Sequence, residues 1–98
     1  MEAETYATEI QCNESLDISM AASLHRTLKE ALESGVAVTL RADKVERADT
    51  AALQVLVAFM RAARARGITV FWNEPSAAVR RSAQLLGLAH ELDIPPQG

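Results

Sequence analysis

The sequence predicts one small α/β domain in which a layer of helices packs against a single sheet. The chain has 98 residues, which is enough for one domain with one core. Stretches of period-2 hydrophobicity alternate along it with stretches of helical period. Residues 36–42, 50–66 and 68–72 read as a strand, a helix and a strand, and such a unit implies parallel strands joined by a right-handed connection.

The N-terminal segment predicts a strand over residues 5–12, within an ordered core of about 5–94. Its alternation places Tyr6, Thr8, Ile10 and Cys12 on one face. The turn residues 13–15 end this strand. Leu16 and Ile18 flank Asp17 and indicate a second, short extended piece.

Residues 19–33 predict the first helix. Its apolar stripe recurs every four residues, at Met20, Leu24, Leu28 and Leu32. Ser19 is the expected N-cap, and Gly35 stands where a left-handed residue ends a helix.

The second half of the chain supplies two strands and two helices. Residues 36–42 alternate cleanly, whereas residues 68–72 are apolar on both faces, which favours a central strand. A third helix is expected over 75–86, with Pro75 in its first turn and Gly87 at its end. We expect its inward side chains to be Val79, Ala83 and Leu86, and one last helical turn to follow in the tail.

The helix over 50–66 has two apolar sides. The stripe that should face the sheet contains Leu53, Leu56, Val57 and Met60, and the opposite side contains Ala51, Val55, Ala58, Phe59 and Ala62. Two interpretations stay open for the second side. A neighbouring helix covers it, or the Val55/Phe59 face is exposed and binds a partner or a second copy as a homodimer.

The start of this helix is the sharpest local feature. Its first N–H groups lack intrahelical partners, and Asp49 is placed to accept them as N-cap. Thr50 then falls in the first turn with its hydroxyl near solvent. A phosphate on that hydroxyl would sit in a site suited to anions, and would repel an acidic partner or obstruct a close apolar contact. A plain helix cap is the alternative interpretation of the Asp-Thr pair.

Three segments resemble STAS domains, the family of bacterial anti-sigma factor antagonists. They are SLDISMAASLHRTLKEAL (15–32), DTAALQVLVAFMRAARARG (49–67) and VFWNEPSAAVRRSAQLLGL (70–88). They match, in order, the family's Leu-Asp segment with the first helix, its Asp-Ser-Ser-Gly-Leu segment with the second helix, and its Asn-Pro-Ser-type turn with a third helix ending in Gly-Leu. The resemblance implies one STAS-like domain over residues 1–98, with a small mixed sheet and three to four helices mainly on one side.

The resemblance also implies a role in bacterial signal transduction and transcription regulation. Family members are usually non-enzymatic switches that bind an ATP-binding, kinase-like anti-sigma factor and release it when a Ser or Thr becomes phosphorylated. The matching position is Thr50, after Asp49, and Asp17 matches the acidic residue of the Leu-Asp segment. On this view Asp17, Asp49, Ala51 and Gln54 border the contact surface, and the domain needs no cofactor.

Three positions depart from the family pattern. Thr50 replaces the commoner Ser, Ala51 stands where Ser is frequent, and Ala52 stands where Gly is usual. A Thr-Ala pair also resembles the STAS subunit of the bacterial lipid-asymmetry ABC transporter, which binds an ATPase subunit. A constitutive subunit of that kind, or a protein of a chemotaxis or two-component pathway, is therefore the alternative, with Thr50 as a contact residue only.

Other sites are disfavoured by the residues present. The net charge of −3 and the lack of aromatic residues among the arginines argue against nucleic-acid binding. His25, His90 and the single Cys12 have no partners at metal spacing, so we expect no metal site. No nucleophile with a base can be assembled around Ser76, so we expect no enzyme. Without a signal peptide or an apolar run near the roughly 20 residues that span a bilayer, we expect no membrane insertion and a cytoplasmic location.

Overall fold

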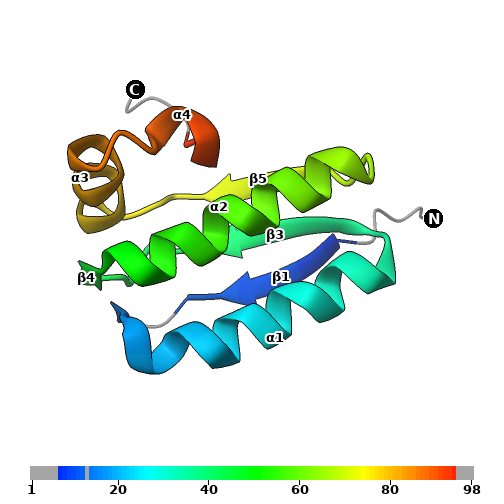
Figure 1. The fold of residues 1–98 in the computed structure, drawn as a ribbon, viewed down its shortest axis with the longest axis horizontal. Helices are drawn as coiled ribbons and strands as arrows, with labels where there is room; N and C mark the ends of the chain where they lie inside the picture. The colour runs from blue at the N-terminus through cyan, green and yellow to red at the C-terminus, as the bar shows by residue number, and fades with distance from the viewer. Residues whose placement is uncertain (1–6, 13, 95–98) are drawn as a thin grey trace.

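The computed structural model of the chain describes residues 7–12 and 14–94, and Figure 1 shows their arrangement. The elements are β1 (Ala7–Gln11), β2 (Ser15–Leu16), α1 (Ile18–Ser34), β3 (Ala37–Arg41), β4 (Arg47–Ala48), α2 (Thr50–Ala65), β5 (Val70–Asn73), α3 (Ala77–Leu85) and α4 (Ala89–Leu92). The predicted α/β class is confirmed, and the predicted ranges of α1, α2 and β3 differ from these by one residue or less at each end. Tyr6 and the prolines at 95 and 96 lie outside the described residues.

The larger sheet has the strand order β1-β3-β5. Every strand pair in the described ranges is parallel, as the strand–helix–strand unit requires. The central strand is β3, so the prediction that residues 68–72 form a central strand is wrong. The strand β5 is apolar on both faces although it lies at an edge, and Phe71 on its outer face is 52% exposed.

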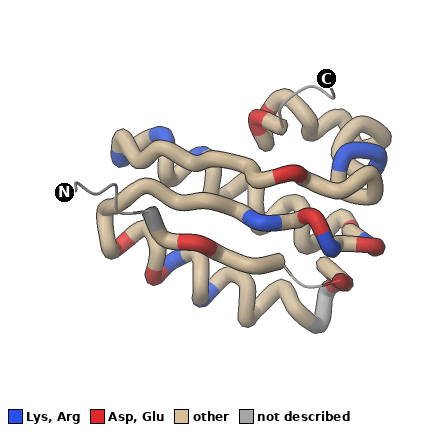
Figure 2. Tube along the Cα trace, turned by 180° about the vertical axis from the view of Figure 1, so that it is seen from behind, with Lys and Arg blue, Asp and Glu red and all other residues tan. Residues whose placement is uncertain are grey.

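The helices α1 and α2 cover one face of this sheet (Figure 1). Beneath them, Val38 and Leu40 of β3 are fully buried against Leu53 and Leu56 of α2. No helix of the described residues lies over the opposite face, where acidic and basic residues are interspersed (Figure 2). The core between the sheet and these two helices is extended by Val79 and Ala83 of α3 and by Leu92 of α4. The helices thus lie mainly on one side of the sheet, as the sequence predicted.

A second, two-stranded sheet holds the starts of α1 and α2 together. Its strands β2 and β4 are parallel, and Leu16 lies opposite Ala48. Each strand is followed almost directly by a helix, and the N–H of Asp49 donates to the carbonyl of Leu16 at 2.7 Å. Leu16 itself is buried. The N-terminal ends of two helices that are far apart in the sequence thus lie side by side.

The C-terminal elements pack beyond β5 and beside α2 (Figure 1). The helix α3 is shorter than predicted because Ser76 caps it, accepting the N–H of Val79 at 3.2 Å, which leaves Pro75 outside the first turn. The predicted last turn is α4. The indole N–H of Trp72 donates to the carbonyl of Leu92 at 2.8 Å and fixes α4 to β5. None of the helices in the described ranges is long and apolar enough to cross a membrane.

Candidate functional site

The start of α1 is closed by Asp17. The N–H of Met20 donates to Oδ1 of Asp17 at 3.2 Å and to its backbone carbonyl at 3.0 Å. The helix begins at Ile18, so Ser19 lies inside the first turn, and its prediction as N-cap is wrong. The carboxylate two residues earlier takes the capping role because it directly follows the extended strand β2.

The start of α2 is different. Asp49 occupies the N-cap position with extended backbone angles (φ −85°, ψ 159°), and its carbonyl accepts the N–H of Leu53 at 3.1 Å. Its side chain, however, makes no capping hydrogen bond, so the predicted position is confirmed and the predicted bond is not formed. The first N–H groups of α2 are therefore not hydrogen-bonded to this carboxylate.

Thr50 is the first residue of α2, and it is exposed. Its hydroxyl has no hydrogen bond to a described residue. Gln54, one turn later, is also exposed, whereas Ala51 is half-buried. Asp17 and Asp49 are half-buried and come together because β2 pairs with β4. The structure thus gathers all five predicted site residues at one end of the molecule.

A shallow cleft of about 550 Å³ opens beside Thr50. We call it the Thr50–Leu85 cleft, and it is lined by Ala48, Asp49, Thr50, Ala51, Ser82, Leu85 and Leu86. The last three residues come from α3 and its C-terminal end. Leu85 is 81% exposed and Leu86 is 41% exposed. We call Leu85 and Leu86 the apolar wall of this cleft, which the candidate switch residue Thr50 also lines.

Sequence reasoning missed this wall. Val79 and Ala83 are fully buried as predicted, but the prediction that Leu86 points inward is wrong. The helix ends at Leu85, and Leu86 is its C-cap, so its side chain leaves the buried stripe. The signal that could have revealed the wall is Leu85, because a leucine outside the Val79–Ala83 stripe of a short helix must face solvent.

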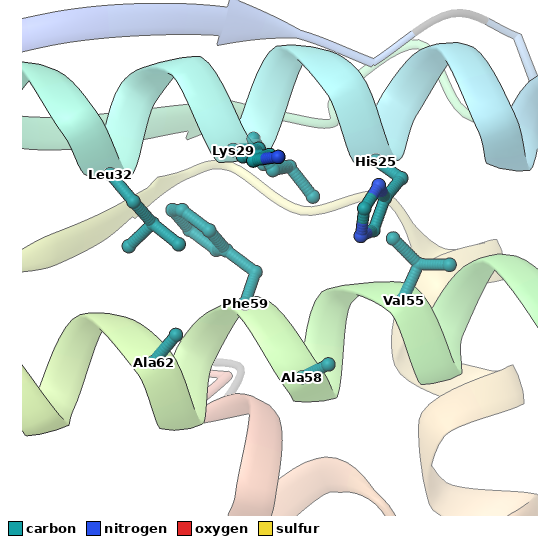
Figure 3. Close-up of a pocket in the computed structure, with 8 residues that line it drawn as sticks. His25, Lys29, Leu32, Val55, Ala58, Phe59 and Ala62 are labelled. Atoms are coloured by element: carbon teal, nitrogen blue, oxygen red, sulfur yellow. The ribbon is translucent and has the colours of Figure 1, made fainter.

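The second apolar side of α2 faces α1. Phe59 is only 3% exposed, and Val55 is half-buried. Figure 3 shows both pointing across a groove toward His25 and Leu32 of α1. The interpretation that a neighbouring helix covers this side is thus confirmed for Phe59. A homodimer through the Val55/Phe59 face stays a prediction, with Val55 rather than Phe59 at the surface.

The remaining side chains that could react or bind a metal are buried, form an ion pair between helices, or are exposed to solvent. Burial raises the pKa of the Cys12 thiol to about 11, so at neutral pH it is protonated and poorly nucleophilic. Arg61 pairs with Glu91 at 2.6 Å, and this contact joins α2 to α4. His90 is exposed. Within residues 7–12 and 14–94, no cluster of three or more His, Cys, Asp or Glu side chains could hold a metal ion.

One comparison with known families gives a match. A family model described as "Mlab, STAS domain" matches residues 2–95. The matched range contains every helix and strand described above, including the starts of α1 and α2 and the whole Thr50–Leu85 cleft. Comparison with curated proteins gives no match.

Proposed function

Because this chain belongs to the STAS-domain family, a family of protein-interaction modules, we propose that it binds an ATP-binding protein through the start of α2, with Thr50 as the switch. The unmodified domain binds the partner. The partner acts as a kinase and transfers phosphate from its own ATP to the Thr50 hydroxyl, and the phosphorylated domain is released. STAS domains are in general non-enzymatic regulatory modules, and in this proposal the chemistry belongs to the partner.

The exposure of Thr50 is the observation that carries the proposal. A kinase must reach the hydroxyl oxygen, and Thr50 is an exposed residue whose hydroxyl has no hydrogen bond to a described residue. The position is also one where a phosphate is tolerated. Unpaired N–H groups and the positive end of the helix dipole favour an anion at the first turn of a helix. Modification would therefore change the surface without unfolding α2.

The neighbouring residues have distinct roles in this proposal. Asp49 contributes a carboxylate beside Thr50 that is not used as a cap. Asp17 borders the same surface from the start of α1, while its carboxylate caps that helix. Ala51 and Gln54 continue the contact surface along α2. A phosphate would add about −1.5 to −2 charges to a surface that already contains two carboxylates.

A second function is favoured by the family description itself. The matching model is described by the name Mlab and not as an anti-sigma factor antagonist. The Thr50-Ala51 pair is the feature that resembled a transporter STAS subunit. In that case the chain is a constitutive subunit bound to an ATPase, and Thr50 is a contact residue that is never phosphorylated.

Substitution of Thr50 separates the two functions. The partner is first recovered by affinity purification with the wild-type chain, then purified and titrated against Thr50→Ala and Thr50→Glu. A switch predicts that Thr50→Ala binds like the wild type, whereas Thr50→Glu binds at least about tenfold more weakly because it adds a charge at the interface. Equal binding by the two variants would refute the switch.

A matched control places the same charge elsewhere. Thr69 is also exposed, but it lies past the C-terminal end of α2, far from Thr50 along the helix. Thr69→Glu should bind the partner like the wild type. Intact-mass measurement after incubation with partner and ATP should show one added phosphate on the wild type and none on Thr50→Ala. A phosphate on Thr50→Ala would place the acceptor at another residue.

A further inference from the structure

We infer that the groove between α1 and α2 binds a small anionic amphiphile, namely a single hydrocarbon chain that ends in a carboxylate. This α1–α2 groove is the one drawn in Figure 3, and Thr50 does not line it. The inference goes beyond the proposed function and does not depend on it. The apolar lining, the size, the basic end and the surrounding charges of the groove support it in turn.

The lining of the groove is mostly apolar. The volume of the groove is about 230 Å³, and an apolar cavity of about 150 Å³ is already enough to bind benzene. Leu28 and Phe59 are almost fully buried at its base, whereas Ala58 is exposed. A hydrocarbon chain in the groove would therefore contact carbon atoms from both helices. The apolar side chains that line it are Leu28, Leu32, Val55, Ala58, Phe59 and Ala62.

The size of the groove favours a single chain over a helix. The lining residues run from 25 to 32 on α1 and from 55 to 62 on α2, which is roughly 10 Å along each helix. Over this length an α-helix of about 10–12 Å diameter needs a volume several times that of the groove, so such a helix would lie over the groove and not in it. A medium-length hydrocarbon chain fits both the length and the volume.

One end of the groove has two basic side chains of α1. Figure 3 shows His25 opposite Val55 at this end, Leu32 beside Phe59 at the other end, and Lys29 between them. Both basic residues are exposed, and neither forms a hydrogen bond or ion pair with another residue in the described part of the chain. The Lys29 ammonium group and a ring N–H of His25 can therefore donate to a carboxylate. The hydrocarbon of the same molecule would then lie toward Leu32 and Phe59.

The other charges on the two helices do not cancel this preference. No Asp or Glu of the described residues lines the groove, and α2 contains no acidic residue. The carboxylates of α1 belong to Glu30 and Glu33, which are exposed outside the lining. Glu33 lies one turn after Lys29, in the order that gives the weaker i,i+4 ion pair. An anionic head group is therefore complementary to the groove, and a cationic one is not. The remaining charged residues of α1, α2 and the C-cap of α2 are the arginines 26, 61, 64 and 66.

Octanoate is the probe, titrated into the isotopically labelled full chain and followed by amide chemical shifts. We expect a dissociation constant below about 1 mM and shift changes mainly in residues 25–32 and 55–62. Octylammonium has the same chain and the opposite charge, and should bind at least about tenfold more weakly. Acetate has the charge without the chain and should cause no shift changes at the same concentrations. Equal affinity for octanoate and octylammonium, or octanoate shift changes only outside the groove, would overturn the inference.

Replacement of Lys29 tests the basic end of the groove. Lys29→Met removes the charge and keeps an unbranched side chain, so octanoate should bind about fivefold more weakly. Lys44→Met is the matched control, because it makes the same change at the other lysine of the chain, outside the groove. This control should bind octanoate like the wild type. Wild-type affinity of Lys29→Met would contradict recognition of the carboxylate and overturn the inference.

A bulky side chain tests the apolar lining. Ala58 is exposed, so Ala58→Trp should stay folded, which circular dichroism and thermal unfolding check. The indole would occupy the groove, and octanoate should no longer change the shifts of residues 25–32. Unchanged octanoate binding by folded Ala58→Trp would place the ligand elsewhere.

A second copy of the chain is the competing occupant of the groove. Sedimentation equilibrium of the wild type at the titration concentration should show a monomer. A dimer that Ala58→Trp dissociates would assign the groove to the second copy and overturn the inference.

The failure of this inference differs from the failure of the proposed function. Thr50→Glu should bind octanoate like the wild type, since Thr50 lies outside the lining. Loss of the switch would therefore leave the amphiphile site intact, and absence of octanoate binding to the wild type would refute the site and leave the switch intact.

Discussion

The two helices that face the sheet, α1 and α2, begin in the same structural setting, but only α1 has a side-chain cap at its start. Each follows a two-residue strand, and these strands pair so that Leu16 lies opposite Ala48. Each is preceded by an aspartate. Asp17 accepts the N–H of Met20 and closes α1, whereas the side chain of Asp49 caps nothing and leaves the start of α2 open.

In the proposed function, this difference separates a helix start that is closed within the domain from one that contacts a partner. At α1 the carboxylate is used for stability. At α2 the carboxylate of Asp49 makes no capping bond, Thr50 is exposed, and the exposed Leu85 and Leu86 line the same cleft. The unpaired groups at such a helix end are satisfied by water or by a ligand, so a partner that displaces this water can supply the contacts.

The largest expected effect on the free energy of unfolding comes from replacing Leu16, which aligns the starts of α1 and α2. Leu16 is buried in β2, and its carbonyl accepts the N–H of Asp49. Leu16→Ala should reduce the free energy of unfolding by about 2–5 kcal/mol, because it leaves a cavity in the core. Urea denaturation measures this change. Leu85→Ala is the matched control at an exposed leucine and should change it by less than about 0.5 kcal/mol. Similar losses for both variants would contradict the burial described here.

A smaller effect on the free energy of unfolding, expected from replacing each aspartate, tests the difference between the two helix starts directly. Asp17→Ala removes a cap and should reduce the free energy of unfolding by about 1 kcal/mol. Asp49→Ala removes a carboxylate that makes no capping bond and should cost no more than about 0.5 kcal/mol. The two variants, measured by urea denaturation in one buffer, serve as controls for each other. A larger loss for Asp49→Ala than for Asp17→Ala would reverse the assigned roles.

The smallest expected effect comes from an ion pair farther along α2, away from its start. Arg61 and Glu91 form an ion pair whose side chains are substantially exposed. A double-mutant cycle with Arg61→Ala and Glu91→Ala should give a coupling energy between about 0.2 and 1 kcal/mol that decreases in high salt. Neither variant should alter partner binding, since both residues lie outside the Thr50–Leu85 cleft. Weakened binding by Arg61→Ala would extend the interface beyond the start of α2.

The order of elements could be predicted because each has a strong local signal. Leu24 and Leu28 mark the buried side of α1, and the glycines at 35, 67 and 87 that end three helices have positive φ angles, as a left-handed terminus requires. The place of β5 in the sheet could not be predicted. Phe71 and Trp72 make this strand apolar on both faces, and periodicity cannot tell a central strand from an edge strand with an exposed aromatic residue.

The candidate site was predicted in part. Asp49 and Thr50 carry a local helix-start signal, so their positions followed from the sequence. Asp17 was assigned to the site only by its resemblance to the family's Leu-Asp segment, because Ser19 was the expected N-cap of α1. Which aspartate makes the capping bond depends on side-chain orientation, and no spacing rule specifies it. The Leu85–Leu86 wall depends on where α3 packs against β4, a tertiary contact between segments that are far apart in the sequence. Leu85 and Leu86 could be identified in the sequence, but their proximity to Thr50 could not be predicted from it.

The most direct test of the account is the affinity of the partner for the phosphorylated domain itself. The wild-type chain is phosphorylated to completion, the modification is located at Thr50 by mass spectrometry, and both forms are titrated with the same purified partner by calorimetry. We predict that the phosphorylated form binds at least about tenfold more weakly while its thermal unfolding is unchanged. Equal affinity of the two forms would contradict the claim that the open start of α2 is a phosphorylation switch.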